Sequence, residues 1–279
     1  MLKLRSPAKI NLFLRVTGRY PNGYHSLASL FQVISLSDYI HFKINPPNEL
    51  QDQLTCTDSS LPTDNSNLIL KAADLFRRKT GLNFHLHAHL EKNIPHQAGF
   101  GGGSGNAATT LWALNTLLEQ NIPETTLQEW SAEIGSDIPF FFAHGTAYCT
   151  GRGEVVERLP AIQDAQLWVV KPKIGLSTPA VFKQLQLNEL LPREPLHFLK
   201  EFSSGNLHCF NDLEEAAFSV HPPLRSLKKL LLDSGFHTVV MAGSGSGFFC
   251  LGEGSPPISQ DLVSYPVSYL NRTAETWYT

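Results

Sequence analysis

A cluster of glycines precedes an alanine- and leucine-rich segment near the middle of the chain. The stretch from Gln97 to Asn115 reads QAGFGGGSGNAATTLWALN, with five glycines from Gly99 to Gly105. Glycine lets a ligand approach the backbone where a Cβ atom would collide. The N-terminus of a following helix offers unpaired N–H groups and a positive dipole end. We interpret the stretch as a cradle for phosphate groups; the alternative is a tight strand-to-helix turn.

Two common nucleotide-binding patterns do not fit this stretch. Walker A requires Lys and then Ser or Thr after its last glycine, whereas Asn106 and two alanines follow Gly105. The dinucleotide pattern G-x-G-x-x-G ends on Ser104 when it starts at Gly99, and on Asn106 when it starts at Gly101. The sequence therefore predicts neither of these folds.

Two charged residues lie in apolar surroundings. Asp137, in IGSDIPFFF, could accept or orient the proton of a hydroxyl during phosphoryl transfer; the alternative is a helix N-cap for the segment that begins at Ile138. Lys9 interrupts the strand-like PAKINLF, and on a buried face it would need an acidic partner. The alternative is a lysine that faces outward. Asn11 shares the strand face of Lys9.

Two further groups of residues have both a chemical and a structural interpretation. GSGSG, Gly243–Gly247, fits a loop near a ligand or a β-turn between apolar strands. His85, His87 and His89 lie on one face of an alternating segment. Because zinc needs a further convergent ligand that the sequence does not indicate, we favour a solvated strand face over a metal site.

The elements that must position these residues are both strands and helices. AKINLFLRV and SLFQVISLSDYIHFKI predict strands, joined by the loop TGRYPNGYHSL. SNLILKAADLFRRKTG predicts a helix that ends at Gly81, and another is expected from about Ser104 to Gln120. TTLQEWSAEIG predicts a helix start, with Thr126 and Glu129 at capping-box spacing.

The second half of the chain begins with the apolar LWVVKPKIGLSTPAVFKQL. LRSLKKLLLDSGFHTVVMAGSGSGFFCLG predicts a helix, a strand, a glycine loop and a strand. The segment after Gly252 has no clear pattern. The mixture of helices and strands predicts an α+β protein with a domain boundary near residues 150–160.

Composition excludes several classes of protein. The 279 residues suit one large domain or two modest ones, and a formal charge of -3 gives no electrostatic reason to expect nucleic-acid binding. No apolar run approaches transmembrane length, and no segment looks like a targeting peptide. The four cysteines are widely spaced, which indicates reduced thiols. We expect a soluble, cytoplasmic protein without nucleic-acid or membrane partners.

Three separated motifs resemble the GHMP kinases, a family that includes galactose, homoserine, mevalonate and phosphomevalonate kinases. They are PAKINLFLRV, GFGGGSGNAAT and GSGSGFF; NGYH, GSDIPFFFAHGTAYCTGRGE and STPAVF extend the resemblance over residues 7 to about 251. The resemblance implies two domains with the active site in the cleft between them. Residues 1–156 would be like ribosomal protein S5 domain 2, and residues 157–279 would be ferredoxin-like.

The resemblance also implies a reaction. ATP, with Mg²⁺, would phosphorylate the 2-hydroxyl of a cytidine diphosphate-linked methylerythritol in the non-mevalonate route to isoprenoids. Asp137 would be the catalytic base and Lys9 its electrostatic partner. The implied ATP-binding residues are Pro95, His96, Gln97, Ala98, Gly99, Phe100, Gly101, Gly102, Gly103, Ser104 and Gly105.

For the substrate, the resemblance implies that Asn11 contacts the alcohol. Tyr24 and Phe182 would sandwich the cytosine, and His25 would hydrogen-bond its edge. Two alternatives stay open: a GHMP kinase with another alcohol substrate, against which the GYH loop argues, and a non-catalytic RNA-binding protein, against which the negative charge argues.

The glycine loop departs from the family's pattern at several positions. Gln97 and Ala98 stand where the family has glycines, Phe100 replaces a leucine, and Gly105 replaces a serine. The missing hydroxyl at Gly105 leaves the magnesium ligands unknown, with Ser104, Thr109 and water as candidates.

Overall fold

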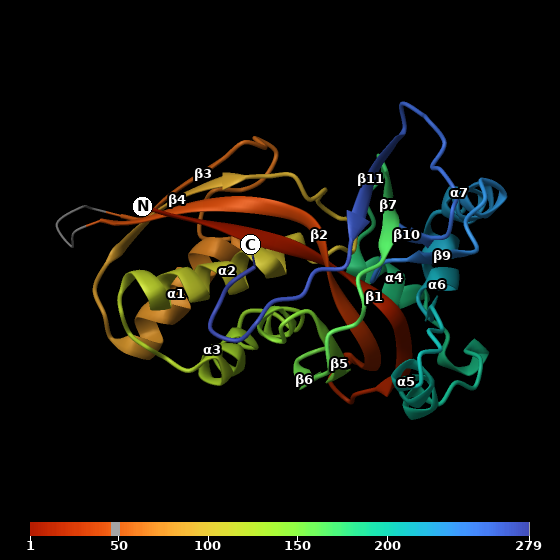
Figure 1. Cartoon of the computed structure of the whole chain (residues 1–279), viewed down its shortest axis with the longest axis horizontal. Helices are drawn as coiled ribbons and strands as arrows, with labels where there is room; N and C mark the ends of the chain where they lie inside the picture. The colour runs from red at the N-terminus through yellow and green to blue at the C-terminus, as the bar shows by residue number, and fades with distance from the viewer. Residues whose placement is uncertain (46–50, 279) are drawn as a thin grey trace.

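Two β-sheets packed against each other form the centre of the molecule (Figure 1). The computed structural model describes residues 1–45 and 51–278. The first sheet has the order β3-β4-β2-β1-β8, and β5 extends it from β2 toward β6. Its strands are β1 (Leu2–Arg19), β2 (His25–Asn45), β3 (Gln53–Cys56), β4 (His85–Glu91), β5 (Thr146–Gly151), β6 (Val155–Arg158) and β8 (Phe210–Asn211).

The second sheet has the order β11-β7-β10-β9. Its strands are β7 (Gln166–Pro172), β9 (Thr238–Met241), β10 (Phe248–Leu251) and β11 (Leu262–Ser268). The helices of the second half are α4 (Thr178–Gln184), η2 (Leu187–Glu189), α5 (Pro195–Ser203), α6 (Glu214–Val220) and α7 (Pro223–Asp233). The predicted order of helix, strand, glycine loop and strand is confirmed in α7, β9 and β10, and the α+β class is confirmed with it.

β1 and β2 form a long antiparallel hairpin whose two faces differ. Ala8, Ile10 and Leu12 are fully buried in the core shared with the second sheet. Because side chains alternate along a strand, Lys9 and Asn11 point to the opposite face, where the helices of the first half lie. A register shift just after Asn11 bends the hairpin at this position.

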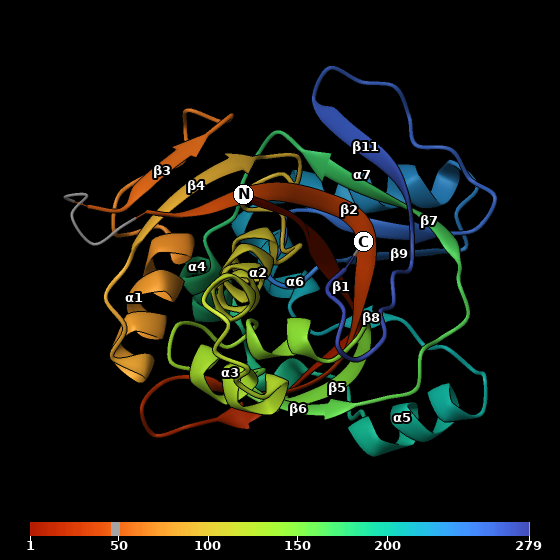
Figure 2. The same cartoon turned by 60° about the vertical axis from the view of Figure 1, so that its left-hand side comes forward.

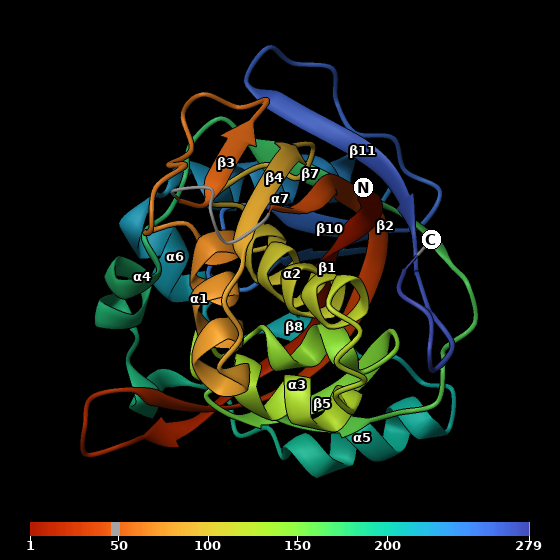
Figure 3. The same cartoon turned by 90° about the vertical axis from the view of Figure 1, so that its left-hand side faces the viewer.

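The helices of the first half cover that opposite face. They are α1 (Leu68–Thr80), α2 (Gly102–Leu117), α3 (Glu124–Ser131) and η1 (Pro139–Phe142). Figure 3 shows α1 and α2 side by side below β4, and Figure 2 shows the second sheet across the β1–β2 hairpin from them. The order is therefore helices, sheet, sheet, helices, with a buried apolar core at each interface.

The helix ends test the sequence-based expectations. The α1 helix ends as predicted, with Gly81 in the left-handed conformation at φ 72°. α2 begins at Gly102 and ends at Leu117, slightly earlier at both ends than expected. The capping-box prediction is wrong: α3 begins at Glu124 after Pro123, so Thr126 already lies inside the helix. Proline has a fixed φ and no N–H, so it is tolerated at the start of a helix but not in its interior, and α3 begins just after Pro123.

The segment after Gly252 forms regular structure that its sequence did not indicate. β11 pairs with β7 along its whole length, and Tyr269 then bridges to Ile34 of β2. Trp277 and Tyr278 are buried in the core of the first sheet. The blue trace that leads to them returns toward α2 in Figure 1. β8 likewise pairs with β1. The proposed boundary between residues 156 and 157 falls inside β6, and the division at this point stays a prediction.

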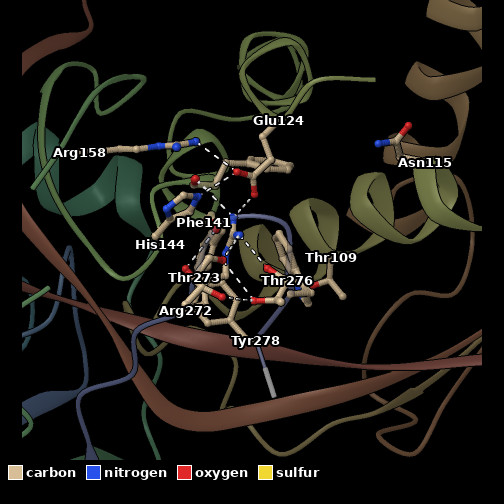
Figure 4. A network of polar contacts seen from close by, with 12 residues as sticks. Thr109, Asn115, Glu124, Phe141, His144, Arg158, Arg272, Thr273, Thr276 and Tyr278 are labelled. Carbon is tan, nitrogen blue, oxygen red and sulfur yellow. Dashed lines mark hydrogen bonds and ion pairs between the residues drawn. The ribbon is translucent and has the colours of Figure 1, made fainter. Parts of the chain in front are cut away.

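Arg272 organises the returning segment (Figure 4). Its side chain is 2% exposed and forms an ion pair with Glu124. A Glu124 carboxylate oxygen also lies 2.8 Å from His144 Nε2, within hydrogen-bond distance. The Arg272 guanidinium lies 5.0 to 5.3 Å from the ring centres of Trp112, Trp277 and Tyr278. Arginine combines a planar charge with aromatic stacking, so one side chain joins three elements.

We expect Arg272→Ala to lower the free energy of unfolding by about 3 kcal/mol, because removal of one partner leaves Glu124 buried with weaker partners. Urea unfolding followed by tryptophan fluorescence measures this directly, since Trp112 and Trp277 flank the lost guanidinium. The matched control is Arg225→Ala, which removes an exposed ion pair with Glu215 and should cost less than about 1 kcal/mol. Equal losses in the two variants would contradict the bracing role of Arg272.

Candidate active site

A cleft of about 760 Å³ opens between the helices of the first half and the second sheet. It gathers residues that are far apart in the sequence: the β1–β2 hairpin, the first glycine loop, the Asp137 turn, the turn between β5 and β6, α4 and the second glycine loop. The lining residues from these segments include Lys9, Asn11, Arg19, Tyr24, His25, Gln97, Gly99, Gly101, Asp137, Arg152, Thr178, Phe182, Lys183, Gly243, Ser244 and Gly245.

The Lys9 ammonium lies against the Asp137 carboxylate, with 3.4 Å between Nζ and Oδ2. The Lys9 side chain is only 3% exposed, whereas that of Asp137 is 37% exposed and faces the cleft. The outward-facing alternative for Lys9 is therefore wrong. The N-cap alternative for Asp137 is also wrong, because Ile138 is the N-cap of η1. The pair presents a partly exposed carboxylate beside a buried positive charge.

Asn11 fixes the position of the Lys9 ammonium. Its Oδ1 accepts hydrogen bonds from Lys9 Nζ at 2.8 Å and from the Gly243 N–H at 3.1 Å, while its Nδ2 donates to Ser29 Oγ at 2.9 Å. Ser29 in turn donates to the Phe13 carbonyl. The carboxamide is thus held in one orientation, and its oxygen is already engaged by two donors.

Most glycines of the first loop are required by close packing within the protein. A Cβ atom at Gly101, where φ is +68°, would lie 2.8 Å from Lys9 Cγ. One at Gly105 would lie 2.6 Å from the Pro7 carbonyl oxygen, and one at Gly99 would overlap the backbone of Ala242. The sequence argument assigned the bare backbone to a ligand, but the loop first needs it to cross β1 and meet the second glycine loop.

The loop still offers a candidate anion site. Gly101 is the N-cap of α2 and has no side chain to cap the first N–H groups of this helix. Of the predicted ATP-binding residues, Gln97, Gly99 and Gly101 line the cleft. The side chains of Ala98 and Phe100 are buried in the core instead.

Several of the remaining predicted ATP-binding residues lie at the surface of the protein. Gly103 is exposed on the first turn of α2, and Ser104 is partly exposed there. Pro95 and His96 precede the loop at the surface. Thr109, considered as a magnesium ligand, is fully buried, and its hydroxyl accepts the Trp277 Nε1–H at 3.2 Å. Thr109 is therefore a poor candidate for a metal ligand.

A buried carboxylate anchors the segment that leads into the glycine loop. Asp38 of β2 accepts hydrogen bonds from the N–H groups of Asn93 at 2.7 Å and Ile94 at 2.8 Å. It also forms a 2.7 Å ion pair with Lys92. These bonds fix the exit of β4, so the loop begins from a rigid point.

The predicted base-binding residues lie at the same cleft. The rings of His25 and Phe182 stack, with 4.9 Å between their centres and 24° between their planes. Tyr24 is 58% exposed, and the Arg152 guanidinium lies 5.2 Å from its ring centre. Burial and the nearby Arg19 charge lower the pKa of His25, so its imidazole is neutral at pH 7. A neutral imidazole has one donor and one acceptor nitrogen.

The cleft carries an excess of positive charge that the sequence did not indicate. Arg19, Arg152 and Lys183 line it together with Lys9. Among the cleft-lining residues that the structure describes, Asp137 is the only one with a carboxylate. Arg19 closes the β1–β2 hairpin and Lys183 lies on α4, so no short motif contains both. Such a cleft attracts ligands with several negative charges.

The histidines of β4 lie on the exposed side of the first sheet, away from the cleft. His89 Nδ1 lies 2.7 Å from the Thr55 hydroxyl, and His41 Nε2 lies 2.5 Å from a Glu91 oxygen. Among residues 1–45 and 51–278, no three His, Cys, Asp or Glu side chains converge to hold a metal ion. Within these same ranges, no helix is long and apolar enough to cross a membrane.

Comparison with known sequences places the chain among kinases. The profile of the GHMP kinases N terminal domain matches residues 67–145. The 4-diphosphocytidyl-2-C-methyl-D-erythritol kinase of Protochlamydia amoebophila is 50% identical over 100% of this chain and 93% of its own length. The chloroplastic enzyme of the same name from Arabidopsis thaliana is 46% identical over 99% of this chain and 76% of its own length.

Solved structures agree with the sequence comparison. A crystal structure of 4-(cytidine 5'-diphospho)-2C-methyl-D-erythritol kinase matches with a TM-score of 0.81 and 30% identity, over 97% of this chain and 100% of the other. Homoserine kinase from Cytophaga hutchinsonii matches over 97% of this chain and 95% of its own, at TM-score 0.72 and 17% identity, which supports the GHMP kinase fold alone. The chain belongs to the 4-diphosphocytidyl-2-C-methyl-D-erythritol kinase family of the GHMP kinases.

Proposed function

We propose that the chain transfers the γ-phosphoryl group of ATP to the 2-hydroxyl of 4-diphosphocytidyl-2-C-methyl-D-erythritol. The relatives that support this span nearly all of the chain and carry that substrate in their names. The observation that carries the proposal is the buried Lys9 beside the accessible Asp137, in the same cleft as Tyr24, His25 and Phe182. The product would serve the non-mevalonate route to isoprenoid precursors.

In this mechanism Asp137 accepts or orients the proton of the substrate hydroxyl as the phosphoryl group is transferred. Lys9 holds the carboxylate in place and stabilises negative charge near the reacting oxygen. The contacts of Asn11 support a role in orienting Lys9, and its contact with the alcohol stays a prediction. Most of the rate enhancement would come from positioning the two substrates.

ATP would bind with its phosphates at the N-terminus of α2, where the loop backbone and the helix dipole favour negative charge. Arg19, Arg152 and Lys183 would attract the diphosphate of the second substrate, which is the chemical group that other alcohols lack. Mg²⁺ would neutralise the phosphates and is usually held through their oxygens and water. Of the two hydroxyls considered, Ser104 remains a candidate ligand.

We also propose that the protein works in the cytoplasm, as a small-molecule enzyme without nucleic-acid or membrane partners. The four cysteines are free thiols, which suits a reducing compartment. Burial raises the pKa of the Cys209 and Cys250 thiols to about 12, so both stay protonated at neutral pH.

We expect Asp137→Asn to lower kcat by about 10²- to 10⁴-fold, because an amide keeps the shape but cannot accept the proton. Binding of ATP should persist, and calorimetry with the non-reacting variant measures it. Asp74→Asn, which changes an exposed carboxylate on α1, is the matched control and should keep kcat. A folded Asp137→Asn variant with near-normal turnover would exclude the base role.

The base-binding residues are tested with the cytidine substrate. His25→Ala and Phe182→Ala should each raise its dissociation constant about ten- to a hundredfold, through loss of a hydrogen bond or of stacking. Affinity for ATP should change little and serves as the internal control. His237→Ala, at an exposed position outside the cleft, should alter neither affinity. Unchanged affinity for the cytidine substrate in both cleft variants would show that the cytosine binds elsewhere.

The glycine loop is tested at Gly101. Gly101→Ala should weaken ATP binding at least about tenfold, since its methyl group would displace Lys9 and strain a left-handed backbone. Gly18→Ala provides the control, because a Cβ atom there meets nothing within 4 Å. Titration calorimetry with ATP compares the two. Equal ATP affinity in the Gly101 variant and the wild type would rule out a phosphate site that depends on this loop geometry.

A further inference from the structure

A short polar turn, residues 211–214, joins the two sheets beneath the cleft. Asn211 ends β8 beside Leu14 of β1, and its side chain is buried. Its Nδ2 donates hydrogen bonds to the carbonyl oxygens of Met241 and Gly243, both at 2.7 Å. Its Oδ1 accepts the N–H of Leu213 at 2.9 Å. Both ends of the carboxamide are therefore engaged with the backbone, and the second glycine loop is tied to the first sheet.

Asp212 and Glu214, which do not line the cleft, strengthen the same turn. Asp212 is 1% exposed at its side chain and forms ion pairs with Arg15 at 2.7 Å and Arg193 at 2.9 Å. Glu214 accepts the N–H of Met241 at 2.9 Å and pairs with Lys228. The turn is thus fixed by several buried polar contacts, and Asn211 is the member that reaches Gly243.

A continuous series of hydrogen bonds leads from Asn211 to the Lys9 ammonium. Asn211 holds the carbonyl of Gly243, whose N–H donates to Asn11 Oδ1 at 3.1 Å. The same oxygen accepts Lys9 Nζ at 2.8 Å, and Lys9 lies 3.4 Å from Asp137. Displacement of Gly243 would remove one of the two donors that orient the Asn11 oxygen. The Lys9 ammonium would then be held less firmly beside Asp137.

We propose that Asn211 is a positioning residue for phosphoryl transfer, acting through Gly243 and Asn11 on the placement of Lys9. The inference rests on the proposed kinase activity, and Asn211 itself is not among the residues that line the cleft. Its effect should therefore fall on the chemical step more than on binding. Small misplacements of reacting groups are costly even when they originate away from the reacting atoms.

The first test is Asn211→Ala, assayed with ATP, Mg²⁺ and the cytidine substrate. We expect kcat to fall on the order of ten- to a hundredfold, with a smaller change in KM for either substrate. Asn115→Ala is the matched control: Asn115 (labelled in Figure 4) likewise binds both the N–H and the carbonyl of one loop residue, Ile122, at 2.9 Å each. That variant should keep kcat within about twofold at a comparable loss of thermal stability.

A double-mutant cycle distinguishes positioning from general loosening. In an Asn11→Ala background, Asn211→Ala should cost no more than about twofold in kcat, because the group through which it acts is already gone. Additive losses, or a kcat in Asn211→Ala equal to that of Asn115→Ala, would overturn the inference. If the alanine variant does not fold, Asn211→Ser, which keeps one donor, enters the same cycle with a smaller expected loss. Absence of turnover in the wild type would instead overturn the proposed function.

Discussion

The burial of one ammonium group constrains the arrangement of the whole cleft. A lysine withdrawn from water is stable only when polar and charged partners surround it, and Lys9 has Asp137, Asn11 and the face of Phe31. Asn11 lies in β1, Phe31 in β2 and Asp137 in the turn before η1, so these three elements must be placed together. The first glycine loop must then cross directly over the same side chain, which excludes a Cβ atom at Gly101.

Segments remote in sequence brace this centre from three directions. Asp38 holds the exit of β4 where the loop begins, and the turn at residues 211–214 holds the second glycine loop. Residues 269–278 pack against η1, which begins two residues after Asp137: the Tyr278 hydroxyl donates to the Phe141 carbonyl. Phosphoryl transfer depends mainly on positioning. These three contacts fix the backbone on either side of the glycine loops and the Asp137 turn, so that the glycine-rich site keeps its geometry.

Much of the fold and of the cleft could be predicted from local signals. Strand-forming residues indicated β1 and β2, period-two alternation indicated β4, and Gly81 indicated the end of α1, because these signals lie within the elements themselves. The charged residues in apolar surroundings, Lys9 and Asp137, do meet in the structure. Capping at α3 was predicted wrongly, since Pro123 decided the start of that helix.

What could not be predicted depends on contacts between distant residues. The roles of Gly99 and Gly105 come from the backbone of Ala242 and Pro7, which no spacing rule connects to the loop. Arg19 and Lys183 reach the cleft from the end of a hairpin and from a short helix. The sequence of β11 has no clear strand pattern, and this segment becomes a strand by pairing with β7. A signal for the turn at residues 211–214 was present: the polar Asn211 and Asp212 stand between the buried apolar Phe210 and Leu213.

We propose that this cleft combines ATP-dependent phosphoryl transfer with recognition of a cytidine diphosphate group. Release of ADP, measured with ATP, Mg²⁺ and a panel of sugar alcohols with and without that group, tests the claim most directly. We expect rapid release of ADP with 4-diphosphocytidyl-2-C-methyl-D-erythritol, whose 2-oxygen then carries a phosphate detectable by ³¹P NMR. With the unlinked alcohol we expect little release of ADP. Equal release from alcohols that lack the cytidine diphosphate, or none from the linked one, would contradict it.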